Sequence, residues 1–377
     1  MPSASASAPS STLSPIIFPS NTSGFARHSP LHPDHRSACG SGFATVAVPM
    51  AHSPPTEWTS EFGGGTWTQI TEADGSPGQW YLHLFDSSQP DLNWSNPDVA
   101  EEFLRVLSFW FDRDVAGIRI DSAALIAKDP RLPVSTGGIR PGPHHPYIDR
   151  DDVHDVYASW RRLADGYEGN RLLVGEVWLE DSRRFALYLR DGELDTAFNF
   201  DFMARPWEAD EIHSSIDDAL SVHLEAAAPP TWVLSNHDVT RPVTRLGRVD
   251  SSFSFSTKRF GVPTDLDLGT RRARAAAFLI AALPGCLYIY QGDELGLPEV
   301  EDIPREALTD PMYERSGRTS PGRDGCRVPC HGAGGAPRMV SVPTGSPRGC
   351  HSPRIGRICV SPVRSWTRRR CSHCTAH

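Results

Sequence analysis

The sequence lacks the features that direct a protein into or across a membrane. Its first twenty residues contain no Lys or Arg, and their only apolar run, residues 16–18, is too short for the core of a signal peptide. The longest mostly apolar stretch, residues 275–287, is interrupted by Pro284 and Gly285 and falls short of a bilayer span. We therefore expect neither a secretory signal nor a transmembrane helix.

Cysteine is scarce in the central part of the chain, and the basic residues there are outnumbered by acidic ones. Five of the eight cysteines lie in residues 330–377, and Cys286 lies in an apolar, strand-like run, so no disulfide framework is expected for the body. That fits a reducing, cytoplasmic compartment. The net charge is −9: residues 1–53 carry +1, residues 330–377 carry +8, and residues 54–329 carry −18. Nucleic acid and anionic membranes are therefore not expected partners, because phosphate neutralisation needs clustered positive charge.

Both ends of the chain differ in composition from the part between them. Residues 1–53 hold 12 Ser and 7 Pro with three charged residues, and neither this segment nor residues 330–377 shows hydrophobic periodicity. We expect both segments to be disordered. Only two of the 37 basic residues are Lys, a bias that suggests GC-rich coding DNA. We hypothesise that frame-shifted or misassigned coding sequence supplies both ends, which an intact reading frame at the resequenced locus would contradict.

The C-terminal segment contains cysteine pairs at the spacing of metal ligands. Three residues separate Cys326 from Cys330, two residues separate Cys371 from Cys374, and four histidines lie nearby. A zinc site needs two such pairs held by turns or strands. The residues between these pairs are mainly Arg, Pro, Gly and Ser, so disorder is the preferred interpretation. No metal or other cofactor is expected.

From Asn96 onward, helical and strand patterns alternate, as in βα units around a parallel sheet. Asn96 is a plausible N-cap and Pro97 a first helical residue, ahead of apolar residues at helical spacing. The further helices are expected near residues 152–164, 182–190, 212–226 and 271–283. The strands are expected at residues 117–121, 171–176, 194–200, 231–236 and 286–290. Five consecutive strands favour part of a (β/α)8 barrel, whose active site lies at the C-terminal ends of its strands.

Polar side chains follow these strands where each one ends. The residues are Asp121, Glu176, Asn236, His237, Asp238 and Glu294. Arg119 lies on the same strand face as Asp121. The carboxylates of Asp121, Glu176 and Asp238, with an Arg and a His on the same rim, indicate acid/base chemistry on a polar, uncharged substrate. Trp178 and Tyr147, on adjoining loops, are expected to be exposed and to suit stacking against sugar rings. Any one of these carboxylates alone could be a helix cap, but their common position at the strand ends favours a catalytic role.

Five short segments follow one another in a characteristic order. They are residues 89–93 (QPDLN), 117–123 (GIRIDSA), 174–178 (VGEVW), 233–238 (VLSNHD) and 285–294 (GCLYIYQGDE). The first resembles the marker near the end of domain B in the alpha-amylase family of glycoside hydrolases (family 13). The others resemble the family's motifs on barrel strands four, five, seven and eight. The resemblance covers residues 54–329 and favours the alpha-glucosidase and oligo-1,6-glucosidase branch, to which residues 323–329 (RDGCRVP) are also similar.

The resemblance implies an α/β fold, namely strands 4 to 8 of a TIM (β/α)8 barrel over residues 97–300. The end of an inserted domain B would precede it at residues 54–96, and a family-like connection would follow at residues 301–329, between disordered termini. The family's third-strand motif, Asp-x-x-x-Asn-His, does not occur. Missing strands would leave the strands at Gly117 and Cys286 with unpaired edges, so we expect a chain that aggregates or has poor activity.

The resemblance also implies a retaining mechanism. Asp121 would be the nucleophile and Glu176 the general acid and base, with carboxyl groups about 5 to 5.5 Å apart. Arg119 would keep Asp121 ionised, and repulsion from Asp121 would keep Glu176 protonated. Asp238 would bind sugar hydroxyls and stabilise the transition state. The residues expected to bind substrate are Arg119, His237, Asn236, Trp178 and Glu294.

The function implied is cleavage of α-glucosidic bonds in short oligosaccharides or disaccharides, with a small carbohydrate as the only expected partner. A transglycosylase or isomerase, such as a trehalose synthase, is an alternative with the same chemistry, because loops determine the acceptor. An inactive remnant or a carbohydrate-binding pseudoenzyme is a second alternative, which the missing third-strand motif supports. The presence of Asp121, Glu176 and Asp238 opposes a loss of catalysis.

Overall fold

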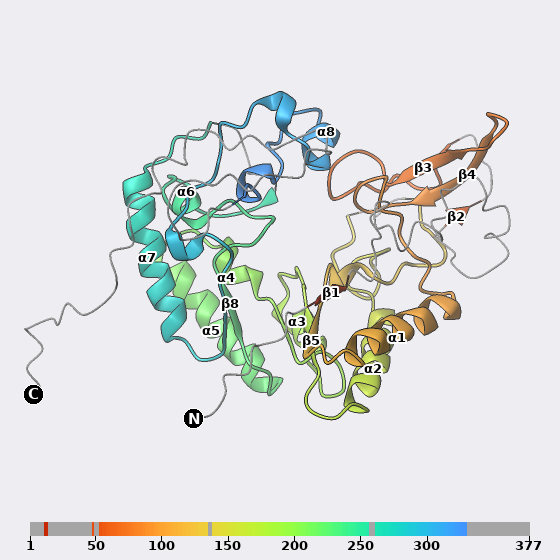
Figure 1. Ribbon diagram of the computed structural model, residues 1–377, viewed down its shortest axis with the longest axis horizontal. Coiled ribbons are helices and arrows are strands. Elements are labelled where there is room, and N and C mark those ends of the chain that lie inside the picture. Colours follow the sequence, from red (N-terminus) through yellow and green to blue (C-terminus); the bar gives the residue numbers. More distant parts are fainter. Residues whose placement is uncertain (1–10, 14–46, 49–52, 135–137, 256–260, 330–377) are drawn as a thin grey trace, which may run out of the picture.

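A computed structural model describes residues 11–13, 47–48, 53–134, 138–255 and 261–329 of the chain (Figure 1). The helices are α1 (Pro97–Phe111), α2 (Asp152–Asp165), α3 (Ser182–Leu187), α4 (Phe200–Ala204), α5 (Ala209–Glu225), α6 (Pro242–Leu246), α7 (Leu266–Ala282) and α8 (Pro311–Arg315). The strands are β1 (Ser11–Leu13), β2 (Ala47–Val48), β3 (Trp67–Thr71), β4 (Pro77–Leu82), β5 (Gly117–Ile120), β6 (Leu172–Gly175), β7 (Thr196–Ala197), β8 (Thr231–Val233) and β9 (Cys286–Tyr288). None of the helices described has both the length and the hydropathy that a membrane crossing requires.

The strands form three sheets and do not close into a barrel within the described residues. One parallel sheet has the order β1-β5-β6-β7, a second pairs β8 with β9 in parallel, and an antiparallel sheet has the order β2-β4-β3. Threonine side chains connect the two parallel sheets. The Oγ1 of Thr231 donates to the carbonyl of Ala197 at 2.8 Å and accepts from the amide of Asn199 at 2.9 Å. Strands and helices are thus arranged as an open series of βα units.

The five strands expected in the body are present, each shorter than its apolar pattern. The strand expected over residues 194–200 is reduced to β7, because Asn199 caps α4 by accepting from the amide of Asp201. The expectation that residues 1–53 are disordered is wrong for β1 and β2. It follows that the edge at Gly117 is paired, since Ser11 lies opposite Ile118 in a parallel ladder. Strands of two or three residues are too short for periodicity to reveal.

The largest core lies between the first parallel sheet and helices α1 and α2, which lie side by side in Figure 1. The predicted start of α1 is confirmed, because the Asn96 side chain accepts from the amide of Asp98 at 3.0 Å and Pro97 is the first helical residue. One face of α1 is buried, at Val99, Phe103, Leu107 and Phe111. This spacing of four residues is close to one helical turn, as the apolar pattern of the sequence predicts.

A buried ion pair joins residues 89–93 to the loop that follows β5. The ammonium of Lys128 contacts the carboxylate of Asp91 and donates to the carbonyl of Leu125 at 2.8 Å. Asp91 also accepts from the amide of Leu84 at 2.7 Å. Burial raises the pKa of Asp91 and lowers the pKa of Lys128. Each charge therefore depends on the other for compensation.

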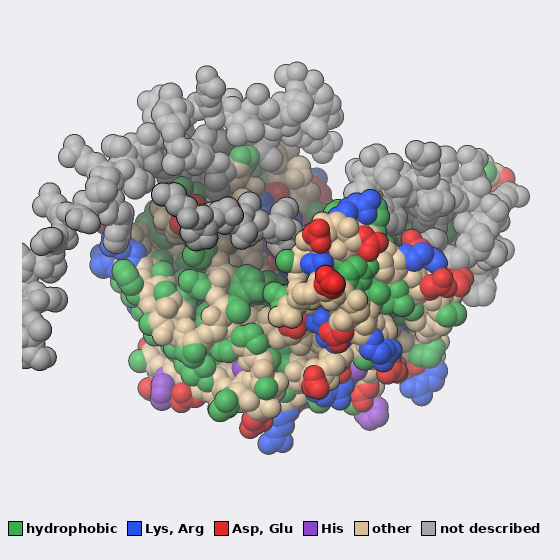
Figure 2. Space-filling view, turned by 60° about the horizontal axis from the view of Figure 1, so that its bottom comes forward, with side chains coloured by type: hydrophobic (Ala, Val, Ile, Leu, Met, Phe, Trp, Pro, Cys, Tyr) green, Lys and Arg blue, Asp and Glu red, His purple; other side chains and the backbone are tan. Residues whose placement is uncertain are grey.

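Large apolar side chains are exposed on α7 and near β9. Phe278 is 70% exposed and Ile289 is 63% exposed. In Figure 2 hydrophobic side chains are scattered over the left part of the face shown, the side on which α5 and α7 lie in Figure 1. Among the described strands β9 pairs with β8 alone, as expected for an unpaired edge at Cys286. Exposed apolar side chains beside the unpaired edge of a strand favour self-association.

We predict that Lys128→Met lowers the free energy of unfolding by about 3 to 5 kcal/mol, because it leaves the buried Asp91 carboxylate without its counter-ion. Urea denaturation at neutral pH measures the loss. The double variant Lys128→Met/Asp91→Leu is the control and should regain much of it, because no buried charge remains. A single variant as stable as the wild type would contradict the assignment.

We also predict that Ile289→Lys reduces self-association, because it places a charge beside the unpaired edge of β9. Sedimentation velocity and light scattering at several protein concentrations measure this. Val249→Lys is the matched control, since Val249 is fully exposed and lies outside α7 and β9. An equal reduction in both variants would show that added charge alone explains the effect.

Candidate active site

Asp121 and Glu176 directly follow the neighbouring strands β5 and β6. These strands are parallel, and Ile120 lies opposite Gly175 in their register. Hydrogen bonding continues past the strand ends, where the amide of Glu176 donates to the carbonyl of Ile120 at 2.8 Å. Because the C-terminal ends of parallel strands meet at one edge of a sheet, the two carboxyl groups are brought together as predicted.

Arg119 binds both of these carboxyl groups. Its Nη1 donates to Asp121 Oδ1 at 2.6 Å, and its Nη2 contacts Glu176 Oε2. The carboxyl groups of Asp121 and Glu176 also hydrogen-bond to each other. The guanidinium of Arg119, which lies on the same strand that Asp121 follows, therefore connects the two carboxyl groups.

The two carboxyl groups have opposite protonation tendencies. Burial, followed by the negative charge of Asp121, raises the pKa of Glu176 to about 8, although Arg119 partly offsets this. Burial alone would also raise the pKa of Asp121, but the hydrogen bond with Glu176 and the charge of Arg119 outweigh it and lower that pKa. At neutral pH the pair therefore consists of a protonated Glu176 beside an ionised Asp121.

Further donors orient Glu176, whose side chain is only 5% exposed. The amide of Ser122 lies 3.3 Å from Oε2, and the indole Nε1 of Trp178 donates to Oε1 at 3.2 Å. Ser122 has a φ of 48°, in the left-handed region that non-glycine residues rarely adopt. This conformation of the residue after Asp121 directs its amide toward Glu176.

The structure separates the two aromatic residues that the sequence placed together. Trp178 lies at the site and stacks on Phe200, with ring centroids 4.0 Å apart. The expectation that Tyr147 is exposed is wrong, because it is 6% exposed and packs against Trp58 with ring centroids 4.9 Å apart. Tyr147 belongs to the core beneath β3 and β4, where burial of its ring outweighs exposure at the loop surface.

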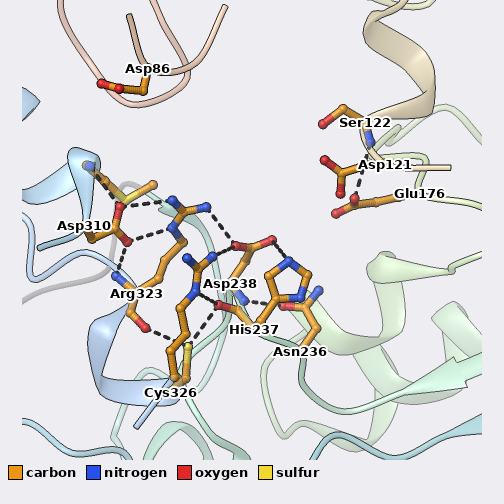
Figure 3. Close-up of polar contacts among 12 residues, drawn as sticks. Asp86, Asp121, Ser122, Glu176, Asn236, His237, Asp238, Asp310, Arg323 and Cys326 are labelled. Atoms are coloured by element: carbon orange, nitrogen blue, oxygen red, sulfur yellow. Dashed lines mark hydrogen bonds and ion pairs between the residues drawn. The ribbon is translucent and has the colours of Figure 1, made fainter. Parts of the chain in front are cut away.

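Asp238 lies across the site in a second group of charged side chains (Figure 3). Its Oδ1 accepts from Arg323 Nη1 at 2.9 Å and from Arg327 Nη2 at 2.7 Å. Its Oδ2 lies 3.3 Å from Nε2 of His237, and its amide donates to Asn236 Oδ1 at 2.8 Å. The chain after β8 thus presents His237 and Asp238 together, as predicted.

Arg323 and Arg327 were not predicted as site residues. They flank the 3-10 turn Asp324–Cys326, so one turn brings both guanidinium groups to Asp238. Residues 323–329 were recognised as family-like, and the spacing of two arginines within them was the available signal. Periodicity could not reveal their role, because a short turn far along the chain reaches Asp238 only through tertiary packing.

The structure does not bring Glu294 to this site. Its side chain is exposed and accepts from the amide of Gly292 at 2.8 Å, within the 3-10 turn Asp293–Leu295. The preceding Asp293 accepts from the hydroxyl of Ser235 at 2.7 Å. These two carboxylates therefore stabilise the backbone around the turn. This is the structural role, similar to that of a helix cap, that a carboxylate at a strand end can have in place of a catalytic one.

The remaining predicted residues line one cavity of about 740 Å³, except Asn236, which lies behind it and accepts from the amide of Asp238. Its walls include Arg119, Asp121, Glu176, Trp178, His237 and Asp238. Other side chains that line it are Glu61, Phe62, Phe85, Gln89, Ile148 and Met312. This volume and its mixture of aromatic and polar groups suit a small polar ligand. In the described part of the chain, no group of three or more His, Cys, Asp or Glu side chains could hold a metal ion.

Comparison with known proteins gives the same family as the sequence motifs. The catalytic domain of the alpha-amylase family matches residues 42–335. A probable alpha-glucosidase of Rhizobium meliloti is 32% identical over 74% of this chain and 49% of its own length. A trehalose-6-phosphate hydrolase of Escherichia coli is 32% identical over 65% of this chain and 42% of its own length. The chain spans about half the length of the curated relatives it matches.

Solved structures share the fold. The alpha-glucosyl transfer enzyme XgtA aligns with a TM-score of 0.64 and 28% identity, over 84% of this chain and 57% of its own. Trehalose-6-phosphate hydrolase of Bacillus licheniformis aligns with a TM-score of 0.62 and 23% identity, over 84% of this chain and 58% of its own. With a match to the catalytic domain over most of its length, the chain belongs to the alpha-amylase family of glycoside hydrolases.

Proposed function

We propose that the protein is a retaining glycosidase that cleaves α-glucosidic bonds in disaccharides or short oligosaccharides. The observation that carries the proposal is the pair formed by a protonated Glu176 and an ionised Asp121, held together by Arg119. A retaining glycosidase needs one carboxylic acid and one carboxylate on neighbouring positions at the sugar. The alpha-glucosidases among the relatives support the same chemistry.

In the first step, Asp121 attacks the anomeric carbon while Glu176 donates its proton to the leaving oxygen. The glycosidic bond breaks, and a covalent bond forms between the sugar and Asp121. In the second step, the Glu176 carboxylate removes a proton from water, the water oxygen attacks the anomeric carbon, and Asp121 is released as a carboxylate. Glu176 regains its proton, so the protein is unchanged at the end of the cycle.

Asp238 and His237 would contact the hydroxyl groups of the same sugar from the opposite wall of the cavity. A carboxylate there stabilises the positive charge that develops at the anomeric carbon in the transition state. Trp178 lines the cavity beside Glu176 and offers an aromatic wall to a sugar ring. These contacts would position the anomeric carbon between Asp121 and Glu176.

We further propose that the sugar is uncharged. Each described arginine that lines the cavity already contacts a carboxylate: Arg119 binds Asp121 and Glu176, whereas Arg323 and Arg327 bind Asp238. A sugar phosphate would have to break one of these pairs or bind beside their carboxylates. The balance of charge therefore favours a neutral glucoside, although a phosphorylated disaccharide appears in the names of some relatives.

Transfer of the glucosyl group to a second sugar is the alternative outcome of the same covalent intermediate. The 28% identity with an alpha-glucosyl transfer enzyme supports it. Hydrolysis releases free glucose, whereas transfer yields a new oligosaccharide, so analysis of the products distinguishes the two. A pseudoenzyme would bind the sugar without forming either product.

We predict that Glu176→Gln lowers kcat/KM toward maltose by about 10²- to 10⁴-fold, the usual contribution of a general acid and base. The wild type and the variant are compared on maltose, isomaltose, sucrose, trehalose and trehalose 6-phosphate by measuring released glucose. Added azide should restore release of p-nitrophenol by the variant from p-nitrophenyl α-glucoside, because azide attacks the intermediate without a general base and carries the sugar away as glucosyl azide. Equal activity of both proteins would contradict the assignment.

We predict that kcat/KM for maltose stays level through neutral pH and falls above about pH 8, because Glu176 must be protonated and its pKa is raised to about 8. The lowered pKa of Asp121 keeps the nucleophile ionised throughout this range. α-Glucosyl fluoride is the control, since fluoride departs with little need of a proton, and its alkaline decline should be weaker. A decline for maltose that begins near pH 5 would contradict the raised pKa.

A further inference from the structure

Asp310 is a buried carboxylate that does not line the cavity but lies next to a residue that does. Its side chain has no exposed surface, and it binds the guanidinium of Arg323 through both oxygens. Arg323 Nε donates to Oδ2 at 2.7 Å, and Nη2 donates to Oδ1 at 3.0 Å. Such a two-point contact restricts the guanidinium in both position and orientation.

The rest of Arg323 faces the catalytic cavity. Its Nη1 donates to Asp238 Oδ1 at 2.9 Å, and its guanidinium lies 4.4 Å from the ring centroid of Phe62. Figure 3 shows Asp310 on one side of Arg323 and Asp238 on the other. One arginine therefore connects a carboxylate outside the cavity with a carboxylate inside it.

Asp310 is itself held in a defined position by backbone groups. As the N-cap of α8 it accepts from the amide of Met312 at 3.0 Å, and it also accepts from the amide of Arg323. Its own amide donates to Asp324 Oδ2 at 3.0 Å. Gly322 approaches so closely that an added Cβ would lie 2.8 Å from the Cβ of Asp310. The carboxylate therefore has little freedom to move with Arg323.

We propose that Asp310 is a positioning residue of the active site, which acts through Arg323 to orient the carboxylate of Asp238. With Arg323 and Arg327 both bound to Oδ1 of Asp238, Oδ2 is directed toward His237. The hydroxyl groups of a sugar would meet the carboxylate in that orientation. The kinetic part of this inference rests on the proposed glycosidase function.

Asp310→Asn tests the proposal, because asparagine keeps the size of the side chain and removes the charge that holds Arg323. We expect kcat for maltose to fall by about 10- to 100-fold, the cost of misplacing a catalytic group. KM should change by less than about threefold, since Asp238 contributes most in the transition state. The melting temperature is measured in parallel, because loss of a buried ion pair lowers it as well.

Glu193→Gln is the matched control. Glu193 is buried and contacts Arg190 at 2.6 Å and His154 at 2.7 Å, but it precedes β7 and lies at the opposite end of the strands from Glu176. We expect it to lower the melting temperature while leaving kcat within about twofold of the wild type. If Asp310→Asn likewise lowers only the melting temperature, Asp310 is structural and the proposal is overturned.

A double-mutant cycle tests the connection without relying on turnover. Asp310→Asn and Asp238→Asn share Arg323, so the double variant should lose less in melting temperature than the two single variants together. Glu193→Gln combined with Asp238→Asn should instead be additive. Additive losses for Asp310 and Asp238 would overturn the proposal. If the losses are not additive but the wild type cleaves no glucoside, only the proposed function is refuted.

Discussion

The contact of one guanidinium, that of Arg119, with two carboxyl groups is the interaction on which the site depends. Asp121 and Glu176 are far apart in sequence, and placing two carboxylates in contact inside a protein is unfavourable. The arginine between them and a single proton on Glu176 make the arrangement stable. The same two conditions give the pair its chemistry, because one group is left able to donate a proton and the other able to attack.

A second set of charges surrounds Asp238 and follows the same principle. Two arginines bind one of its oxygens, and Asp310 compensates one of those arginines from outside the cavity. Around the cavity, the charges of Arg119, Asp121, Asp238, Arg323 and Arg327 are thus each matched by a neighbour. A site of this kind can hold a neutral, polar molecule and still present strong fields to charge that develops during a reaction.

The architecture around the site is an open series of βα units, and this openness has a cost. The side chains proposed to be catalytic follow strands of the pairs β5–β6 and β8–β9, while threonines rather than a ladder connect the two sheets. Large apolar side chains near β9, such as Ile289, remain exposed. The charged groups around Arg119 and Asp238 therefore have partners, whereas apolar side chains on the outer surface of the same βα units do not.

The sequence by itself determined the order of helices α1, α2, α3, α5 and α7 and of strands β5 to β9, the cap at Asn96 and the grouping of Asp121, Glu176 and Asp238. These follow from local periodicity and from the rule that parallel strands end at one edge. Only the tertiary structure decided that Tyr147 is buried, that Glu294 lies away from the cavity, and that Arg323 reaches Asp238. Such contacts join segments far apart in the chain, and their geometry depends on packing that no local pattern encodes.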